Sequence, residues 1–304
     1  MQIIRNFQNI NKELTGTILT LGNFDGIHLG HQAILNDIRT IAKNYNTKSA
    51  LLTFEPHPIK IIKPEKAQDI RLQSLEGKLR FLKKNNLVDA VFLVGFNLRL
   101  ADLKAEYFVK NLLVDKLNIK HLAIGYDFAF GKNREGNIEL LEKLSKNYGF
   151  GLTKIEAKND LSNQIYSSSK VRELIKSGQI KLANSMLGRP YEISGIVVAG
   201  QKIARNLGFP TANLIPKTNL IKPKYGVYKA LVNNQYKAIV NFGVKPTFEN
   251  NKPLFEAHIF EFNQDIYGKK INVELLDFIR EEKKFSSIEE LRNQIKIDCK
   301  IANA

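Results

Sequence analysis

Two histidines within a glycine-rich segment are the first residues of this chain that point to chemistry. Residues 22–31 read Gly-Asn-Phe-Asp-Gly-Ile-His-Leu-Gly-His and directly follow an apolar run. His28 and His31 are three residues apart, so they share one face of a helix that begins there. The amino end of a helix attracts anions, and an imidazole can donate a hydrogen bond to a phosphate whose charge grows during transfer. The segment predicts a phosphate-handling turn; the alternatives are an ordinary surface turn and a metal pair, which would need further ligands.

A second candidate site lies in the other half of the chain. Phe209-Pro210 forms a rigid turn that presents the Thr211 hydroxyl and the Asn213 side-chain carbonyl. Hard oxygen donors of this kind suit Mg²⁺, which usually keeps waters and substrate phosphates as its other ligands. The segment therefore predicts a magnesium–phosphate site, and an ordinary loop with polar caps is the alternative.

Composition restricts the class of protein that carries these segments. The chain has 304 residues, which predicts two domains, and a net charge of +16, for which a solvated charged surface is the simplest explanation and a general attraction for phosphate ligands is the alternative. No cluster of Lys and Arg interleaved with aromatic residues is present, so we expect no nucleic-acid partner. No run of eighteen apolar residues and no signal-peptide pattern occur, so we expect no membrane partner and a cytoplasmic protein. The single cysteine, Cys299, cannot form an internal disulfide; the oligomeric state stays open.

The first half alternates short apolar runs with amphipathic stretches. This alternation predicts a parallel sheet with helices on both faces, in which ligands bind at the carboxyl ends of the strands. We expect strands at residues 16–23, 49–54, 89–95, 119–125 and 151–156, with helices at 32–43, 74–84, 104–116 and 137–147.

The second half changes character after two short helices expected at residues 169–176 and 179–187. Its strands follow one another without intervening helices, and Asn233-Asn234 predicts a tight hairpin turn between two of them. We expect a small antiparallel barrel with a terminal helix at 286–301, and domains at 1–184 and 185–304. The expected strands are 191–198, 227–232, 236–241, 255–260 and 271–278.

Several strings, in the same order along nearly the whole chain, resemble the bacterial bifunctional riboflavin kinase/FMN adenylyltransferases, also called FAD synthetases. The resemblance implies an α/β fold: a Rossmann-like nucleotidyltransferase domain with a parallel sheet, then a riboflavin kinase-like β-barrel. Besides residues 22–31, the strings are Thr-Phe-Glu-Pro-His-Pro at 53–58, Ile-Gly-Tyr-Asp-Phe-Ala-Phe-Gly at 124–131, Arg-Glu-Gly at 134–136, Ser-Ser-Ser-Lys-Val-Arg at 167–172, the segment 195–213 with Pro-Thr-Ala-Asn, Phe-Glu-Ala-His at 255–258, and landmarks at 241–248, 265–268 and 279–285.

For the first domain, the resemblance implies adenylyl transfer from ATP to FMN, which gives FAD and pyrophosphate. Positioning and charge neutralisation dominate such a reaction. His28 and His31 would be catalytic. The residues implied to hold ATP and its phosphates are Asn23, His28, His31, Ser168 and Arg172, and those implied to line the substrates are His57 and Asp127. The serine run departs from the family at Ser169, where threonine is usual.

For the second domain, the resemblance implies phosphorylation of riboflavin to FMN by Mg²⁺–ATP. Thr211 and Asn213 would hold Mg²⁺–ATP, and Glu256 would accept the proton of the riboflavin 5′-hydroxyl. His258 lies on the same face of its strand as Glu256 and is expected to be a neighbour rather than a second base. Ala204 stands where the family usually has glycine. The alternatives are another His-x-Gly-His nucleotidyltransferase and a basic nucleic-acid-binding protein.

Overall fold

The structure is a computed structural model, and its residues fall into two compact units. It describes residues 1–5, 10, 12–156, 158, 165–199, 208–216, 219–244 and 253–303. The first unit comprises Met1–Gln68 and Leu75–Ser167, and the second comprises Asp69–Ser74 and Ser168–Ala304. Among the described helices, none is both long and apolar enough to cross a membrane.

The first unit is built on a six-stranded sheet in which every neighbouring pair is parallel. The strands lie in the order β1-β4-β3-β2-β5-β6. From β2 the chain proceeds outward on one side and then returns to add β5 on the other, so the strand order reverses beside β2. The strands are β1 (Gln2–Ile4), β2 (Ile18–Leu21), β3 (Ser49–Glu55), β4 (Ala90–Gly95), β5 (His121–Gly125) and β6 (Gly151–Ile155).

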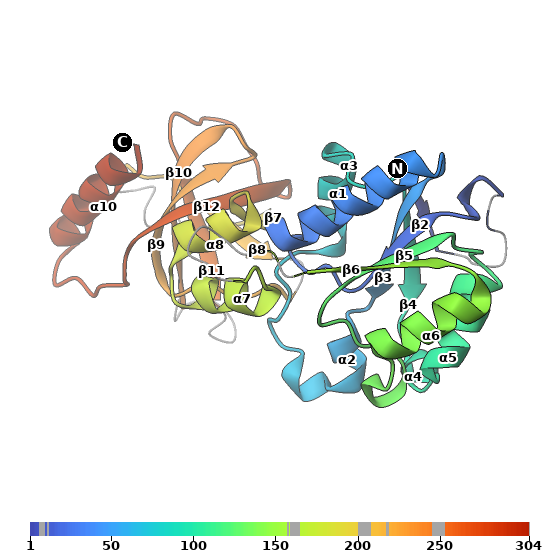
Figure 1. The fold of residues 1–304 in the computed structure, drawn as a ribbon. Coiled ribbons are helices and arrows are strands. Elements are labelled where there is room, and N and C mark those ends of the chain that lie inside the picture. Colours follow the sequence, from blue (N-terminus) through green and yellow to red (C-terminus); the bar gives the residue numbers. More distant parts are fainter. Residues whose placement is uncertain are drawn as a thin grey trace. The chain divides into compact units, whose positions relative to one another are not determined.

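Helices cover both faces of this sheet, with α1 and α3 on one face and α5 and α6 on the other (Figure 1). Each crossover between parallel strands carries helix, as the alternating pattern predicts. The helical segments are η1 (Lys12–Leu14), α1 (Leu29–Asn44), α2 (Pro58–Ile62), η2 (Pro64–Lys66), α3 (Leu75–Lys84), α4 (Leu98–Ala101), α5 (Ala105–Phe108), the π-helical η3 (Val109–Val114), η4 (Lys132–Arg134) and α6 (Ile138–Tyr148).

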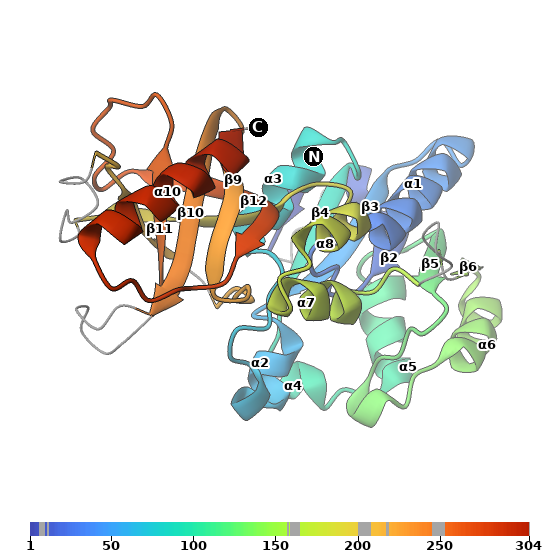
Figure 2. The same ribbon diagram turned by 90° about the vertical axis from the view of Figure 1, so that its left-hand side faces the viewer.

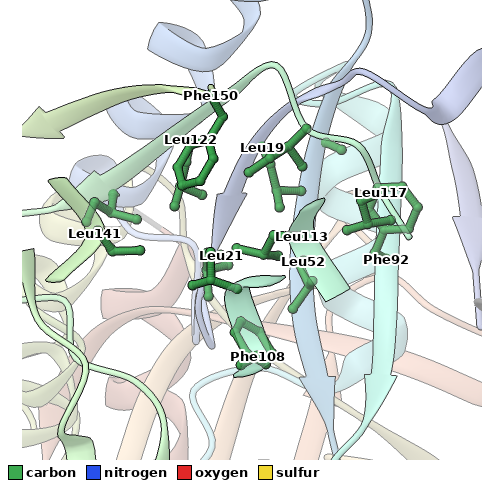
Figure 3. Close-up of a cluster of buried hydrophobic side chains, with 14 of the residues drawn as sticks. Leu19, Leu21, Leu52, Phe92, Phe108, Leu113, Leu117, Leu122, Leu141 and Phe150 are labelled. Carbon is green, nitrogen blue, oxygen red and sulfur yellow. The ribbon is translucent and has the colours of Figure 1, made fainter. Parts of the chain in front are cut away.

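Successive residues of the central strands enter different hydrophobic clusters. Ile18 packs with Leu35 and Ile38 of α1, whereas its neighbour Leu19 packs with Leu141 on the opposite face. Side chains of a strand alternate between faces, so a fully apolar strand supplies both layers of core. Figure 3 shows the second layer, in which leucine and phenylalanine side chains from the sheet meet those of η3 and α6.

The second unit is a closed antiparallel barrel in the order β10-β11-β8-β7-β12-β9. Phe242 and Phe255 are opposite each other on β10 and β11, and their rings stack at 4.2 Å in the buried interior. The strands are β7 (Tyr191–Val198), β8 (Ala212–Pro216), β9 (Gly226–Val232), β10 (Tyr236–Val244), β11 (Pro253–Ile259) and β12 (Lys270–Arg280).

In the part of the second unit that the structure describes, the helices beside the barrel are α7 (Ser168–Lys176), α8 (Ile180–Leu187) and α10 (Ile288–Asn303). Helix α8 contacts β7 and β12. Helix α10 lies across β9 and β10, as Figure 2 shows, and Ala302 packs there against Val227 and Ile239. Cys299 lies beside this cluster, and burial raises the pKa of its thiol to about 11, so the thiol is protonated at neutral pH.

The predicted architecture is confirmed in both units, including the tight turn at Asn233-Asn234. Both of these residues have positive φ, and Gln235 N–H donates to Val232 O, which is the geometry of a type I′ hairpin turn. Strands β1 and β8 were not predicted. β1 has only three residues with an exposed pattern, and β8 is enclosed by Pro210 and Pro216.

Candidate functional site

The glycine-rich turn of the first unit lies at the carboxyl end of β2, between β3 and β5. This is the point where the strand order reverses, which is where open parallel sheets bind their ligands. The turn is tightly wound: Gly26 has φ +79°, and Phe24 and Ile27 also have positive φ. Non-glycine residues in this region are uncommon and cluster at functional sites.

The two predicted histidines meet at the start of α1. Their rings stack at 3.7 Å between centroids, and the Phe24 ring stacks on His31 at 4.5 Å. His28 is the N-cap of α1, where its Nδ1 accepts a hydrogen bond from His31 N–H at 3.4 Å. An imidazole whose Nδ1 accepts must, in its neutral form, carry the proton on Nε2. Nε2–H of His28 is thus a donor that the cap itself does not use.

Gly30 explains why a glycine separates the two histidines. A Cβ built on Gly30 would lie 3.2 Å from the His28 ring atoms Cε1 and Nδ1 and 3.1 Å from Tyr166 Cβ. These distances are tighter than normal van der Waals contact, so a side chain at position 30 would displace the His28 ring. The absence of a side chain lets the ring lie over the first turn of α1.

His57 and Asp127 follow the two strands that flank β2. His57 follows β3 after Pro56 and caps α2, accepting a hydrogen bond from Ile59 N–H at 3.3 Å. Asp127 follows β5, and its Oδ1 lies 3.5 Å from where a Cβ of Gly125 would stand, beside Ile34 of α1. Because the sheet is parallel, both residues are at the same edge as the histidines.

Ser168 and Arg172 belong to the second unit. Ser168 is the first residue of α7, and Arg172 follows one turn later, as the serine run predicts. Arg172 Nε donates to the backbone oxygen of Ile70 at 2.6 Å. The expected role of both residues in ATP binding stays a prediction.

In the barrel, Asn213 lies within β8 and Glu256 lies opposite it on β11. Directly opposed residues of an antiparallel pair share one face of the sheet, with Cβ atoms about 4.5–5.5 Å apart. Asn241 of β10 is the other register partner of Glu256, so the three form a row across the barrel wall. Asn213 is buried, with 5% of its surface exposed. Thr211 directly precedes β8, and the turn predicted for Asn213 is in fact the first part of a strand.

His258 links the strand of Glu256 to the Phe209-Pro210 turn. Its Nδ1 lies 2.8 Å from the Pro210 carbonyl oxygen, and its ring makes an edge contact with Phe209 at 5.5 Å. A carbonyl oxygen only accepts, so Nδ1 carries the proton in this contact. His258 therefore holds the turn that leads to Thr211, and its expected place as a neighbour of Glu256 rather than a second base stays a prediction.

The side-chain oxygens beside the Phe209-Pro210 turn suit a hard cation such as Mg²⁺ whose remaining ligands come from a bound substrate. Thr211 and Asn213 offer neutral oxygens, and Glu256 offers one carboxylate in register with Asn213. Among the described residues no group of three or more His, Cys, Asp and Glu could hold a metal by itself. Such a set leaves most Mg²⁺ positions to phosphates and water. Ala204, with residues 200–207 and 245–248, lies outside the described residues.

The sequence-based reasoning missed Lys78, which lies beneath the first turn. Lys78 is only 7% exposed, and its ammonium donates to the backbone oxygen of Asn23 at 2.5 Å. A signal was available, because Leu75, Lys78, Leu79 and Leu82 follow the i, i+3, i+4, i+7 spacing of a buried helix stripe. A lysine at one position of such a stripe predicts a buried charge.

Two family models match the sequence in succession: one described as FAD synthetase at residues 10–170, and one described as riboflavin kinase at 187–304. The chain is 39% identical to the bifunctional riboflavin kinase/FMN adenylyltransferase of Haemophilus influenzae, over 100% of this chain and 99% of that protein. It is 38% identical to the protein of that name from Buchnera aphidicola subsp. Schizaphis graminum, over 99% and 97%. A crystal structure described as a macrolide-efflux protein from Streptococcus pneumoniae matches with a TM-score of 0.88 at 30% identity, covering 100% of this chain and 99% of its own.

Proposed function

The chain belongs to the bifunctional riboflavin kinase/FMN adenylyltransferase family, and from this premise we propose which of its residues carry out each of the two reactions. The enzyme phosphorylates riboflavin with ATP to give FMN, and it transfers an adenylyl group from ATP to FMN to give FAD and pyrophosphate. We assign adenylyl transfer to residues 1–184 and the kinase reaction to residues 185–304. The two family models leave this boundary between their matched ranges, which supports the assignment.

Adenylyl transfer takes place at the turn after β2. A phosphate oxygen of FMN attacks the α-phosphorus of ATP, the bond from that phosphorus to the bridging oxygen breaks, and pyrophosphate leaves with the electron pair. His28 and His31 donate hydrogen bonds to the phosphates as charge builds up, and the amino end of α1 adds its positive potential. The observation that carries this proposal is the place of the two histidines, whose rings stack at the first turn of α1 after β2, where the strand order reverses.

Asn23, His57 and Asp127 complete this site at the same edge of the sheet. Asn23 opens the turn, and we assign it to the ATP phosphates. His57 and Asp127, which follow β3 and β5, line the substrates on the two sides of β2. Their common position at the carboxyl ends of adjacent strands supports this assignment.

The kinase reaction takes place at the row formed by Asn213 and Glu256. The riboflavin 5′-hydroxyl gives its proton to the Glu256 carboxylate while its oxygen forms a bond to the γ-phosphorus of ATP, and ADP leaves. Thr211 and Asn213 would hold Mg²⁺ together with the ATP phosphates. When bound, the cation neutralises phosphate charge. The register pairing of Asn213 with Glu256 brings the metal ligand and the base to one face of the barrel wall, which supports both roles.

The two reactions can be tested separately in one protein. Purified enzyme with riboflavin, ATP and Mg²⁺ is expected to yield FMN and then FAD, measured by chromatography. Glu256→Ala is expected to abolish FMN formation and to retain FAD formation from supplied FMN, and His28→Ala is expected to show the reverse. Equal loss of both reactions in either variant contradicts the assignment of the two sites.

A further inference from the structure

A buried lysine beneath the His28 turn has no part in the reactions as derived above. The Lys78 ammonium donates to the Asn23 backbone oxygen at 2.5 Å and approaches Thr53 Oγ1 at 3.4 Å. The Thr53 hydroxyl donates to the same Asn23 oxygen at 3.2 Å. Two donors, one of them charged, thus converge from α3 and β3 on a single carbonyl at the end of β2.

This carbonyl belongs to the peptide that opens the phosphate turn. In a trans peptide the C=O and N–H bonds point in opposite directions, so fixing the Asn23 oxygen also fixes the Phe24 N–H. Phe24 has φ +45°, and its amide N–H donates to no acceptor among the described residues. A fixed amide N–H on a residue of left-handed conformation, as Phe24 has here, is part of the backbone geometry that binds anions.

The position of Lys78 argues against a purely structural role. Burying an ammonium costs free energy that an apolar side chain would not cost, and Lys78 occupies one position of the apolar stripe of α3. Leucine or methionine there would complete the stripe with Leu79 and Leu82. The chain instead places a fixed positive charge next to the turn that handles phosphates.

We propose that Lys78 is a positioning residue for adenylyl transfer, which together with Thr53 fixes the Asn23–Phe24 peptide so that the Phe24 N–H is directed at a phosphate of bound ATP. This inference rests on the assignment of adenylyl transfer to the His28 turn. A donor that is oriented before the reaction stabilises developing charge without reorganisation, so its effect falls on kcat more than on KM.

The test measures FAD formation from supplied FMN in variants of the full chain. Lys78→Met is expected to lower kcat about 30-fold and Thr53→Val about fivefold, with KM for ATP changed less than about twofold. Because both residues act on one carbonyl, the double variant is expected to be no slower than Lys78→Met alone. Lys84→Met, an exposed lysine of the same helix, is the matched control and is expected to leave kcat unchanged.

Circular dichroism and the thermal unfolding transition of the same samples report whether the first unit, which contains Lys78 and Thr53, is folded, and riboflavin kinase activity reports whether the second unit is intact. If Lys78→Met does not fold, Thr53→Val carries the test, since valine matches threonine in shape. An unchanged kcat in Thr53→Val, or effects of the two substitutions that multiply in the double variant, overturns the inference. His28→Ala distinguishes failure of the site assignment from failure of the Lys78 proposal. If His28→Ala retains FAD formation, adenylyl transfer is wrongly assigned to the His28 turn. If His28→Ala loses FAD formation while Lys78→Met keeps it, only the positioning role of Lys78 is wrong.

Discussion

Asn213 and Glu256 are register partners in the antiparallel pairing of β8 with β11. Their side chains leave one face of the barrel wall at neighbouring positions, although 42 positions separate them in the sequence. Strand pairing, rather than a flexible loop, therefore sets the spacing between the proposed metal ligand and the proposed base. A site held by two paired strands keeps its geometry better than one held by loops alone.

Removal of the Asn213 oxygen is expected to impair the kinase reaction selectively. Asn213→Ala should lower kcat for FMN formation about 100-fold and raise the Mg²⁺ concentration needed for half-maximal rate, because one cation ligand is lost. Asn213→Asp keeps an oxygen donor and should recover part of the rate. Steady-state assays with a Mg²⁺ titration measure both effects. A Mg²⁺ requirement that stays unchanged in Asn213→Ala would contradict the role of Asn213 as a ligand.

Loss of the His258 hydrogen bond is expected to slow the kinase without removing its base. His258→Phe keeps a ring against Phe209 and deletes the Nδ1–H bond to the Pro210 carbonyl, so the turn before Thr211 loses an anchor. We expect kcat for FMN formation to fall about tenfold, in line with the effect of a small misplacement of a reacting group. His258→Gln, which can still donate, should lose less. Equal kcat values for His258→Phe and His258→Gln would show that the hydrogen bond to the Pro210 carbonyl does not support the kinase reaction.

A side chain at position 30 is expected to disturb adenylyl transfer through the His28 ring. Gly30→Ala places a Cβ 3.2 Å from two ring atoms, and alanine also favours helix, so stability should be kept while the ring shifts. We expect kcat for FAD formation to fall about tenfold, with riboflavin kinase activity unchanged. Gly95→Ala is the matched control, because no atom lies within 4 Å of its added Cβ. A Gly30→Ala variant with full adenylyl transfer would show that His28 tolerates displacement.

The sequence predicted those parts of both sites whose signals lie close together along the chain. The strand–turn–helix around His28 follows from one apolar run, two glycines and the helix that begins at Leu29, all within about fifteen residues. What it could not predict depends on contacts between distant segments. The pairing of Asn213 with Glu256 needs the order of the barrel strands, and β8 was hidden because its flanking prolines are typical of a turn.

Acidification is expected to destabilise the first unit through His121. This residue is 9% exposed, its Nε2 lies 2.8 Å from Thr153 Oγ1, and burial lowers its pKa below the ordinary value. The unfolded chain therefore binds more protons than the folded chain between that lowered pKa and about 6.5, so the free energy of unfolding decreases as pH falls through this window. His121→Gln should reduce the pH dependence of the melting temperature between pH 8 and pH 5. If the melting temperature of His121→Gln depends on pH as steeply as that of the unmodified protein, His121 does not contribute to the acid sensitivity.

Replacement of Asp298 is expected to release α10 from the barrel. Asp298 is 1% exposed and accepts hydrogen bonds from Arg280 Nε at 3.0 Å and Nη2 at 2.7 Å, and from Gln294 at 2.9 Å. Asp298→Asn leaves the Arg280 guanidinium without its charged partner, so the free energy of unfolding should fall by about 3 kcal/mol. On heating, riboflavin kinase activity should then be lost before adenylyl transfer.

A matched pair of variants distinguishes this buried ion pair from an ordinary surface pair. Glu281, whose exposed carboxylate lies 2.5 Å from the Lys224 ammonium, belongs to the same unit, and Glu281→Gln should leave the unfolding transition nearly unchanged. Arg280→Met combined with Asp298→Leu removes both charges together and should recover most of the stability lost in Asp298→Asn, because no buried charge is left uncompensated. Urea unfolding of the full chain, followed by kinase activity, measures all three. If the double variant is less stable than Asp298→Asn, the loss comes from packing rather than from an unpaired charge.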